Sequence, residues 1–501
     1  MRGSLHLTGD AILAIDQGTT NTKGLCVGST GACLFAVSAT VPMSRMRLEW
    51  LEQSPEAVWA SVEEVVRQCL AFCRDSGLKI AGVAVTNQRE TAVAWDRVTG
   101  QALGNAISWQ CRRSAGVCSK LAGGADLVRR KAGLPLDPLL TATKWRWMLE
   151  ESEAAPALRA LAGKDRLWLG TIDSWLIHKL CGGSAHVTDH SNASRTGLLH
   201  LESLEWDDEL LQLFDIPRAA LAQLVPSMGV AGICDSTTPL KGLPIVAVVG
   251  DSHAALVANG GGRIKATYGT GSSLMVRVET LPACSTGLAR TVAWSTPGQV
   301  YYALEGNIVM AGACIRWLGE FFGLPRAVEG IVALSESVED SDGVVFVPAM
   351  AGLGAPYWDA SARGAIFNLG PHHRVAHVAR AAVEAIAHQV ADVFELLKQS
   401  TGVHFDEICA DGGATRNAGL MQFQADILNC DVLRSKAEEL SALGAAWLGG
   451  IALDWWPSIA TPYSASAIPE RFSPRMDAST RALSRSHWKT AVRRTLTAED
   501  V

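Results

Sequence analysis

An acidic residue, a glycine and several small hydroxyl side chains follow the first apolar segment of the chain. Directly after residues 11–15 comes the run Asp16-Gln17-Gly18-Thr19-Thr20-Asn21-Thr22-Lys23. A glycine lets backbone N–H groups approach a phosphate closely, hydroxyls and an ammonium add donors, and a carboxylate can hold a cation against the phosphate. The run therefore predicts a phosphate-binding turn with a cation at Asp16, although a single strand followed by a glycine turn is more often plain structure.

Two more glycine turns occur in the second half of the chain. Tyr268-Gly269-Thr270-Gly271-Ser272-Ser273 again follows an apolar segment, and Asp411-Gly412-Gly413-Ala414-Thr415-Arg416-Asn417 precedes an expected helix. Free N–H groups and the helix dipole favour anions at such a helix start. Three turns so far apart predict one ligand bound by both halves with a cleft between them, and a nucleoside triphosphate meets that demand.

The segments around these turns alternate between strand and helix patterns. In the first half we expect a hairpin of residues 23–28 and 32–39, a helix capped by Ser54 that runs to residue 73, and buried strands at 80–85, 91–95, 166–171 and 245–249. In the second half we expect strands at 265–269, 274–278, 291–295, 300–304 and 406–410, with helices at 307–322 and 375–399.

Size and composition limit the class of protein. The chain has 501 residues, 48% of them hydrophobic and 19% charged, which favours two domains rather than one core. A net charge of -6 gives no argument for a nucleic-acid or anionic-membrane partner, and no apolar run is long enough to span a bilayer. Twelve cysteines without a CxxC pair and no secretory pattern in the first ten residues predict a cytoplasmic protein.

Two common nucleotide-binding folds are disfavoured by their motifs. The chain has no GxxxxGK[ST] and no GxGxxG after the first strand. The duplicated α/β architecture that remains is the ribonuclease H-like or actin-like ATPase fold. We therefore expect two such domains, residues 1–257 and 258–501, around a central catalytic cleft.

Over nearly its whole length the sequence resembles the FGGY carbohydrate kinases, and among them those that phosphorylate glycerol. The stretches that carry the resemblance include Asp16-Gln-Gly-Thr-Thr, Thr86-Asn-Gln-Arg-Glu-Thr91, Asn105-Ala-Ile-Ser-Trp-Gln110, His186-Val-Thr-Asp, Asn192-Ala-Ser-Arg-Thr196, Gly250-Asp251, Thr267-Tyr-Gly-Thr-Gly271 and Asp411-Gly-Gly-Ala414.

The resemblance implies that a primary hydroxyl of a small polyol or sugar attacks the γ-phosphate of MgATP. Asp251 matches the general base, and Asp16 with Asp251 would hold Mg²⁺ through water. Asp251 could equally cap the helix expected at 252–259. The positions that match acceptor-binding residues are Arg89, Glu90, Trp109, Leu139, Asp251, Ser252 and Ser273. Those that match ATP-binding residues are Thr19, Thr20, Asn21, Lys23, Gly269, Thr270, Gly312, Arg316, Gly413 and Asn417.

The acceptor pocket departs from the glycerol pattern. Leu139 stands where Tyr is usual, Ser252 where Gln is, Ser273 where Phe is, Cys111 where Asp is, and Arg316 where an ATP-contacting Gln is common. Glycerol is the preferred acceptor because residues 86–91 match its kinases, whereas a larger polyol or ketose, such as a tetritol or pentulose, is the alternative.

Two non-kinase readings stay open from the sequence: a nucleotide-binding module that closes on a protein partner, and a catalytically silent sensor. The resemblance also implies a homodimer or homotetramer. The short segment before Gly242 predicts no inhibition by fructose bisphosphate.

Overall fold

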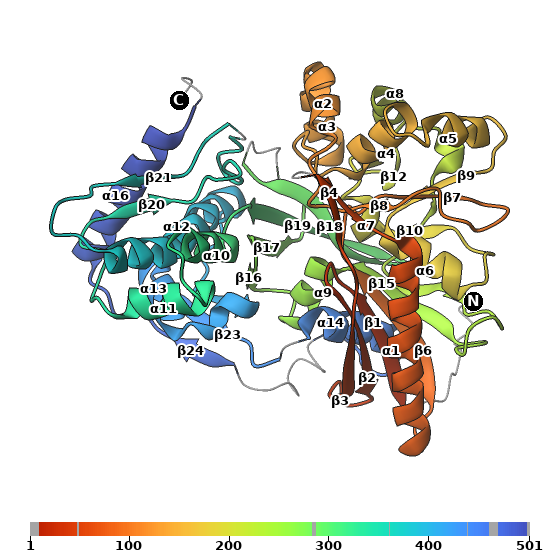
Figure 1. Cartoon of the computed structure of the whole chain (residues 1–501). Helices are drawn as coiled ribbons and strands as arrows, with labels where there is room; N and C mark the ends of the chain where they lie inside the picture. The colour runs from red at the N-terminus through yellow and green to blue at the C-terminus, as the bar shows by residue number, and fades with distance from the viewer. Residues whose placement is uncertain are drawn as a thin grey trace. The chain divides into compact units, whose positions relative to one another are not determined.

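The computed structural model describes residues 10–47, 50–282, 287–359, 361–437, 439–459 and 469–497 (Figure 1). The chain divides into two compact units. The first comprises Met1–Gly261, Arg290–Ala303 and Glu439–Ser466, and the second Gly262–Ala289, Leu304–Glu438 and Ala467–Val501. The expected border after residue 257 stays a prediction about domains, and the chain returns to the first unit twice after the units change at Gly261.

A six-stranded mixed sheet forms the centre of the first unit, in the order β14-β15-β6-β1-β2-β3. Its strands are β1 (Ala11–Gln17), β2 (Asn21–Gly28), β3 (Cys33–Thr40), β6 (Ile80–Asn87), β14 (Met228–Ile233) and β15 (Pro244–Gly250). The first three are antiparallel neighbours, which confirms the expected hairpin, whereas β6 pairs parallel with both β1 and β15. Parallel pairing brings the carboxyl ends of β1, β6 and β15 to one edge of the sheet.

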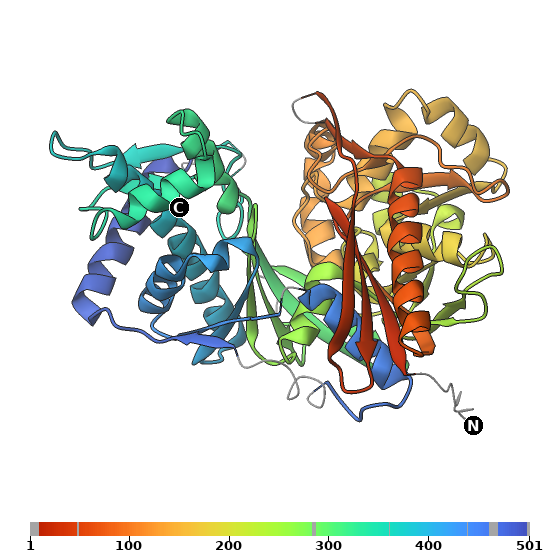
Figure 2. The same cartoon turned by 60° about the horizontal axis from the view of Figure 1, so that its bottom comes forward.

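Helix α1 (Pro55–Asp75) covers one face of this sheet, beside the red strands in Figure 2. Ser54 begins the helix as expected, because its hydroxyl accepts a hydrogen bond from the Ala57 N–H at 3.2 Å and Pro55 occupies the first turn. Its apolar stripe, which includes Val58, Val62 and Cys69, packs against the sheet.

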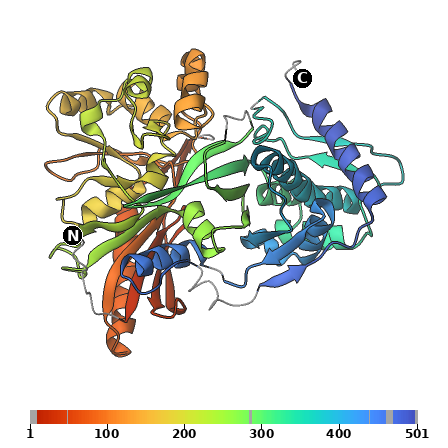
Figure 3. The same ribbon diagram turned by 180° about the vertical axis from the view of Figure 1, so that it is seen from behind.

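On the same unit, α9 (Asp251–Ala258) and α14 (Leu440–Ala452) pack against each other, as the yellow-green and blue helices of Figure 3 show. Gly444 of α14 makes the contact possible. A Cβ at Gly444 would lie 1.8 Å from the Ala254 carbonyl oxygen, so the two helix backbones touch where the side chain is missing.

The rest of the first unit consists of small sheets and short helices. The elements are β4 (Ser44–Arg47), β5 (Trp50–Gln53), β7 (Val93–Asp96), β8 (Ala106–Ile107), α2 (Ala115–Lys120), η1 (Ala122–Gly124), α3 (Ala125–Ala132), α4 (Thr141–Glu150), α5 (Ala155–Ala162), β9 (Leu167–Gly170), α6 (Ile172–Leu180), β10 (Val187–Asp189), α7 (His190–Ala193), β11 (Leu199–His200), β12 (Glu205–Trp206), α8 (Asp208–Phe214), η2 (Arg218–Ala220) and β13 (Gln223–Val225). The strands expected at 91–95 and 166–171 exist as β7 and β9, but they pair with each other in a separate antiparallel sheet rather than in the central one.

The sheet of the second unit repeats the strand order of the first. It has seven strands in the order β18-β19-β17-β16-β22-β23-β24, of which the six from β19 to β24 match the first sheet. β16 (Ile264–Tyr268) is antiparallel to β17 (Ser272–Val278) and parallel to β22 (Glu407–Asp411). The other elements after residue 262 are β18 (Ala289–Thr296), β19 (Gln299–Ile308), α10 (Gly312–Phe321), α11 (Ala327–Glu336), β20 (Val345–Val347), β21 (Ala365–Phe367), α12 (Val375–Thr401), η3 (Gly413–Arg416), α13 (Ala418–Leu428), β23 (Asp431–Arg434), β24 (Glu470–Phe472) and α16 (Ala478–Thr495). The helix expected from residue 307 was wrong at its start, because Asn307 and Ile308 still pair within β19 and the helix begins at Gly312.

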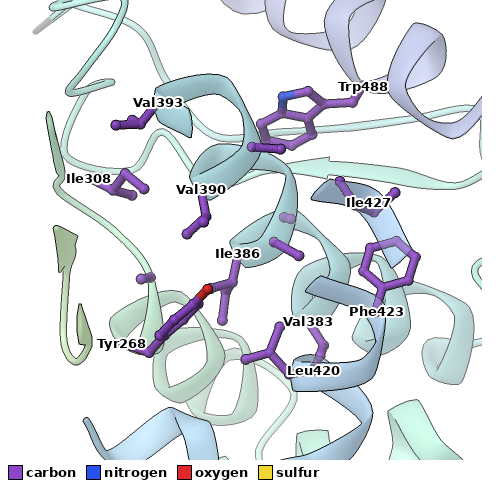
Figure 4. Close-up of a cluster of buried hydrophobic side chains, with 14 of the residues drawn as sticks. Tyr268, Ile308, Val383, Ile386, Val390, Val393, Leu420, Phe423, Ile427 and Trp488 are labelled. Atoms are coloured by element: carbon purple, nitrogen blue, oxygen red, sulfur yellow. The ribbon is translucent and has the colours of Figure 1, made fainter. Parts of the chain in front are cut away.

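Helix α12 passes through the core of the second unit. Val383, Ile386, Val390 and Val393 lie along α12 in one buried cluster with Ile308, Tyr268 and Leu420 (Figure 4). Phe423, Ile427 and Trp488 belong to the same cluster. An α-helix that is apolar on most sides is a buried one. Together the two sheets and their covering helices confirm a duplicated mixed α/β fold.

Candidate active site

Two carboxylates meet at the carboxyl edge of the first sheet. In the strand register Asp16 lies opposite Thr86, and Gly250, which precedes Asp251, lies opposite Asn87. Burial and, second, the negative charge of Asp251 together raise the pKa of Asp16 to about 7, while Lys23 opposes the change. Mutual repulsion between two carboxylates is the electrostatic condition that a divalent cation relieves, so this edge fits Mg²⁺.

Asp251 is the first residue of α9, and its side chain remains about one-third exposed. Gly250 rather than Asp251 is the N-cap, so the capping role considered from the sequence was wrong. One carboxylate oxygen accepts a hydrogen bond from the Ser252 N–H at 2.6 Å and lies 3.2 Å from Nε of Arg89. Arg89 therefore holds the Asp251 carboxylate by an ion pair while the side chain stays in reach of solvent, an arrangement that suits a proton acceptor.

The phosphate turn predicted from residues 16–23 closes between β1 and β2. The Gly18 N–H donates to the Asn21 carbonyl at 2.9 Å, and Gln53 donates to the Thr19 carbonyl at 2.7 Å. Nε1 of Trp109 donates to the Thr19 hydroxyl at 2.9 Å, which joins the aromatic side chain assigned to the acceptor to the turn assigned to phosphate. Thr20 is exposed at the tip of the turn.

Lys23 is the third residue of β2, where it lies opposite Asp16 in the strand register. Its ammonium lies 2.5 Å from the Glu439 carboxylate, so the group expected to donate to phosphate is engaged in an ion pair within the first unit. Asn21 also begins β2, where its amide donates to the Thr20 hydroxyl at 3.2 Å.

Glu90 sits in a conformation that residues with a side chain rarely adopt, with φ of 61°. It is buried, and its carboxylate accepts a hydrogen bond from Nε of Arg195 at 2.6 Å. Arg89 and Glu90 therefore do not pair with each other: Arg89 points to Asp251 and Glu90 to Arg195.

The side chain of Leu139 is half-buried, and both of its backbone polar groups are hydrogen-bonded. Its N–H donates to the Asp137 carboxylate at 2.8 Å, and its carbonyl accepts from the buried ammonium of Lys144 at 2.5 Å. Burial lowers the pKa of Lys144 to about 8, against the attraction of Glu90. Ser252 is half-buried at the start of α9, while Cys111 is fully buried and accepts from Nε of Arg113 at 3.0 Å.

In the second unit the glycine turns converge. The turn Gly269-Thr270-Gly271 joins β16 and β17, at the same place in its sheet as the turn after β1, and the Gly312 N–H donates to the Gly269 carbonyl at 2.9 Å. Gly412 has φ of 96°, and a Cβ there would lie 2.5 Å from the Tyr268 carbonyl oxygen. Close approach of bare backbone with exposed N–H groups is the form of a phosphate cradle.

Other residues predicted for the nucleotide lie around this cradle. Gly413 has open space where a Cβ would be, and Asn417 caps α13 by accepting from the Leu420 N–H at 2.9 Å. Arg316 is exposed on α10. Ser273, which was predicted for the acceptor and not for the nucleotide, is buried on β17 opposite Thr267.

Some residues of the site were missed from the sequence. Three buried glutamines lie beneath the phosphate turn. Nε2 of Gln88 donates to the side-chain oxygen of Gln17 at 3.0 Å and to that of Gln53 at 2.8 Å. Arg195 and Ser191 contact Glu90 and Gly250. Polar residues within apolar flanks were the available signal, because buried polar groups need partners.

The chain belongs to the FGGY family of carbohydrate kinases, because residues 11–258 match its N-terminal domain and residues 264–453 its C-terminal domain. It is therefore an ATP-dependent phosphotransferase, and the expected fold is confirmed. The glycerol kinases of Paraburkholderia phymatum and Burkholderia pseudomallei are each 40% identical over 488 residues, which cover 96% of this chain and 97% of theirs.

Solved structures agree with the assignment. Plasmodium falciparum glycerol kinase with ADP superposes with a TM-score of 0.89 at 28% identity, over 98% of this chain and 99% of that one. Xylulose kinase from Lactobacillus acidophilus, at 21% identity and a TM-score of 0.85, shares the fold. Over the described part of the chain, none of the helices combines the length and apolar character that crossing a bilayer demands.

Proposed function

We propose that the chain transfers the γ-phosphoryl group of ATP to a primary hydroxyl of glycerol, giving glycerol 3-phosphate, with Asp251 as the general base. The observation that carries the proposal is the position of Asp251 at the carboxyl edge of the first sheet, beside Asp16 and ion-paired to Arg89. The Asp251 carboxylate accepts the hydroxyl proton as the oxygen attacks phosphorus and ADP leaves. Relatives 40% identical that are named glycerol kinases support the acceptor.

Asp251→Asn tests the base. The amide keeps the size of the side chain but cannot accept the proton, so kcat should fall by roughly a hundredfold to ten-thousandfold while KM for ATP is retained. Asp208→Asn is the matched control, because Asp208 is also the first residue of a helix, but that helix, α8, does not follow a strand of the central sheet. A variant Asp251→Asn with the wild-type rate would remove Asp251 from the role.

We assign Mg²⁺ to Asp16 and Asp251, through water. The fit is supported by the position of both residues at the carboxyl edge of the sheet and by the raised pKa of Asp16, to which burial contributes most and the negative charge of Asp251 second. When bound, the ion neutralises charge on the phosphates. Activity without added Mg²⁺ after chelation would contradict this assignment.

The acceptor site, phosphate turn and base are assigned to residues 1–257, and most of the ATP site to residues 258–501. The acceptor residues are Arg89, Glu90, Trp109, Leu139 and Ser252 from the first range, joined by Ser273 from the second. The nucleotide residues are those predicted from the sequence. Support comes from the Trp109 bond to the phosphate turn in the first unit and the converging glycines in the second.

A larger polyol or a ketose is the second candidate acceptor. Leu139 presents an aliphatic side chain, Ser252 a short one and Ser273 a small buried hydroxyl at the acceptor positions. The test ranks glycerol, tetritols, pentuloses and sugar acids by kcat/KM with MgATP. Glycerol should rank first, and a tetritol or pentulose in that place would replace it. ATP binding without turnover of any acceptor would favour a silent sensor.

Assembly and compartment complete the proposal. We infer a homodimer or homotetramer, which the family assignment supports. We also infer a cytoplasmic location, for which the sequence argument is its twelve cysteines without a CxxC pair. Light scattering of the purified protein measures the assembly, and a monomer would contradict it.

A further inference from the structure

A short buried segment, residues 189–196, contacts the strands and helices that carry the acceptor site. It includes α7, and its side chains are buried except for His190. Residues 186–189 and 192–196 are part of the family resemblance, but neither stretch contains a residue matched to the acceptor, the nucleotide or the metal ion. Their hydrogen bonds show which groups they hold.

Arg195 holds Glu90. Its Nε donates to Oε1 of Glu90 at 2.6 Å, and the two side chains are only 2% and 5% exposed. The left-handed backbone of Glu90 needs such contacts to persist, because non-glycine residues rarely adopt it. The Thr141 hydroxyl adds a donor to the Glu90 carbonyl at 3.3 Å. Arg195 therefore sets the direction in which the second carboxylate oxygen of Glu90 is presented.

Ser191 and Asn192 hold the strand ends. The Gly250 N–H donates to the Ser191 hydroxyl at 2.9 Å, which fixes the residue that precedes Asp251 and caps α9. Asn192 exchanges side-chain amide hydrogen bonds of 3.0 Å and 3.1 Å with Asn87 at the end of β6. One segment thus contacts the peptide before Asp251 and the strand end that leads to Arg89.

Asp189 keeps this segment rigid. Its buried carboxylate accepts hydrogen bonds from the Ser191 N–H at 2.8 Å, the Asn192 N–H at 2.9 Å and the Ser227 hydroxyl at 2.6 Å. A carboxylate satisfied by several donors in a buried site defines one conformation. Ser191 and Asn192 are therefore preset before any ligand binds.

We propose that residues 189–196 form a positioning element for phosphoryl transfer, in which Arg195 orients Glu90 toward the acceptor and Ser191 orients Asp251 through Gly250. The proposal rests on the proposed function, since it takes Glu90 as an acceptor ligand and Asp251 as the base. Arg195 and Ser191 act through these neighbours. Their loss should therefore affect different kinetic constants.

Arg195→Met tests the Glu90 branch. KM for glycerol should rise by about tenfold to a hundredfold, because the Glu90 carboxylate loses a charged hydrogen-bond partner, while KM for ATP stays unchanged. Arg290→Met is the matched control, since Arg290 is also buried in the first unit but donates to the carbonyls of Arg129 and Arg130 at 3.1 Å and 2.8 Å. Arg195→Lys, which retains the charge and displaces the donor, should raise KM for glycerol by less.

A double-mutant cycle separates positioning from a general loss of structure. If Arg195 acts through Glu90, Arg195→Met in a Glu90→Gln background should cost no more than Glu90→Gln alone. Losses that multiply, or a folded Arg195→Lys protein with the wild-type KM for glycerol, would overturn the positioning role while the proposed function stands. An unchanged KM for glycerol in Glu90→Gln itself would instead overturn the acceptor assignment and this inference with it.

Ser191→Ala tests the Asp251 branch. Freeing the Gly250 N–H should lower kcat by about tenfold with little change in KM for glycerol, since loss of one buried hydrogen bond displaces the base. Thr196→Val is the control, because Thr196 lies in the same buried segment but its hydroxyl donates to the Ala193 carbonyl at 2.7 Å and accepts from the Leu198 N–H at 3.1 Å. Equal losses of kcat in Ser191→Ala and Thr196→Val would show that the segment, rather than the Gly250 contact, was damaged, and would overturn this branch.

Discussion

Asp251 and Glu90, the two carboxylates proposed for the acceptor site, are each held by a different arginine. Arg89 lies 3.2 Å from Asp251, and Arg195 lies 2.6 Å from Glu90. Glu90 is buried and Asp251 is partly exposed, so the two carboxylates suit different roles in a polyol kinase. Glu90 is suited to accept fixed hydrogen bonds from the acceptor, and Asp251 is suited to exchange a proton.

Leu139→Tyr tests the acceptor specificity at the residue scale. The backbone of Leu139 is fixed by Asp137 and Lys144, so the substitution changes the side chain and leaves the loop in place. The added hydroxyl should lower KM for glycerol by about tenfold. Leu139→Phe, which adds the ring without the hydroxyl, is the control, and an equal gain from Phe would assign the effect to bulk.

Asp173 provides a prediction for stability against pH. Burial and the nearby Asp189 raise the pKa of Asp173 from 3.8 to about 6, against the hydroxyls of Thr171 and Thr188. The folded state therefore binds this proton more tightly than the unfolded state, and the stability contributed by the protonated carboxyl is lost as pH rises from about 4 to about 6. Asp173→Asn should stabilise the protein at pH 8 by up to about 3 kcal/mol.

Denaturant unfolding at two pH values measures this effect. At pH 4 the Asp173→Asn and wild-type proteins should differ little, because Asp173 is protonated in the folded state. A variant less stable than wild type at both pH values would contradict the prediction and show that the hydrogen bonds of the carboxyl outweigh its desolvation.

At the scale of elements, the position of Asp251, the proposed base, depends on how α9 is packed. Helix α9 begins at Asp251, rests on α14 through Gly444, and is fixed at its start by Ser191. A strand end, a helix start and a buried loop therefore determine where the Asp251 carboxylate lies.

Gly444→Ala tests this packing. The new Cβ would lie 1.8 Å from the Ala254 backbone, which cannot move without moving α9, so both stability and kcat should fall, the former by about 1–3 kcal/mol despite the better helix propensity of alanine. Gly116→Ala in α2 is the control, because nothing lies within 4 Å of its added Cβ. Unchanged kcat in a destabilised Gly444→Ala protein would separate α9 packing from catalysis.

At the scale of the whole molecule, the same strand order occurs in both units, and each places a glycine turn between its first two strands. The two turns were predicted from the sequence because the pattern is local: an apolar strand, then glycine and hydroxyls. Helix α1 was predicted for the same reason, since its cap and apolar stripe lie within one segment. The start of α10 was not, because pairing with a distant strand extends β19 to Ile308.

The sequence by itself determined the class of fold, the glycine turns and, through its family motifs, the kinase assignment, since each depends on residues that are neighbours in the chain. Only the tertiary structure decided that Lys23 pairs with Glu439, that Gly250 rather than Asp251 caps α9, and that Glu90 is held by Arg195. Lys23 and Glu439, and likewise Glu90 and Arg195, are far apart in sequence, so no spacing could predict their pairing. Burial makes a partner obligatory for Glu90, and the cap of α9 depends on which residue takes the first helical turn once the strand has ended.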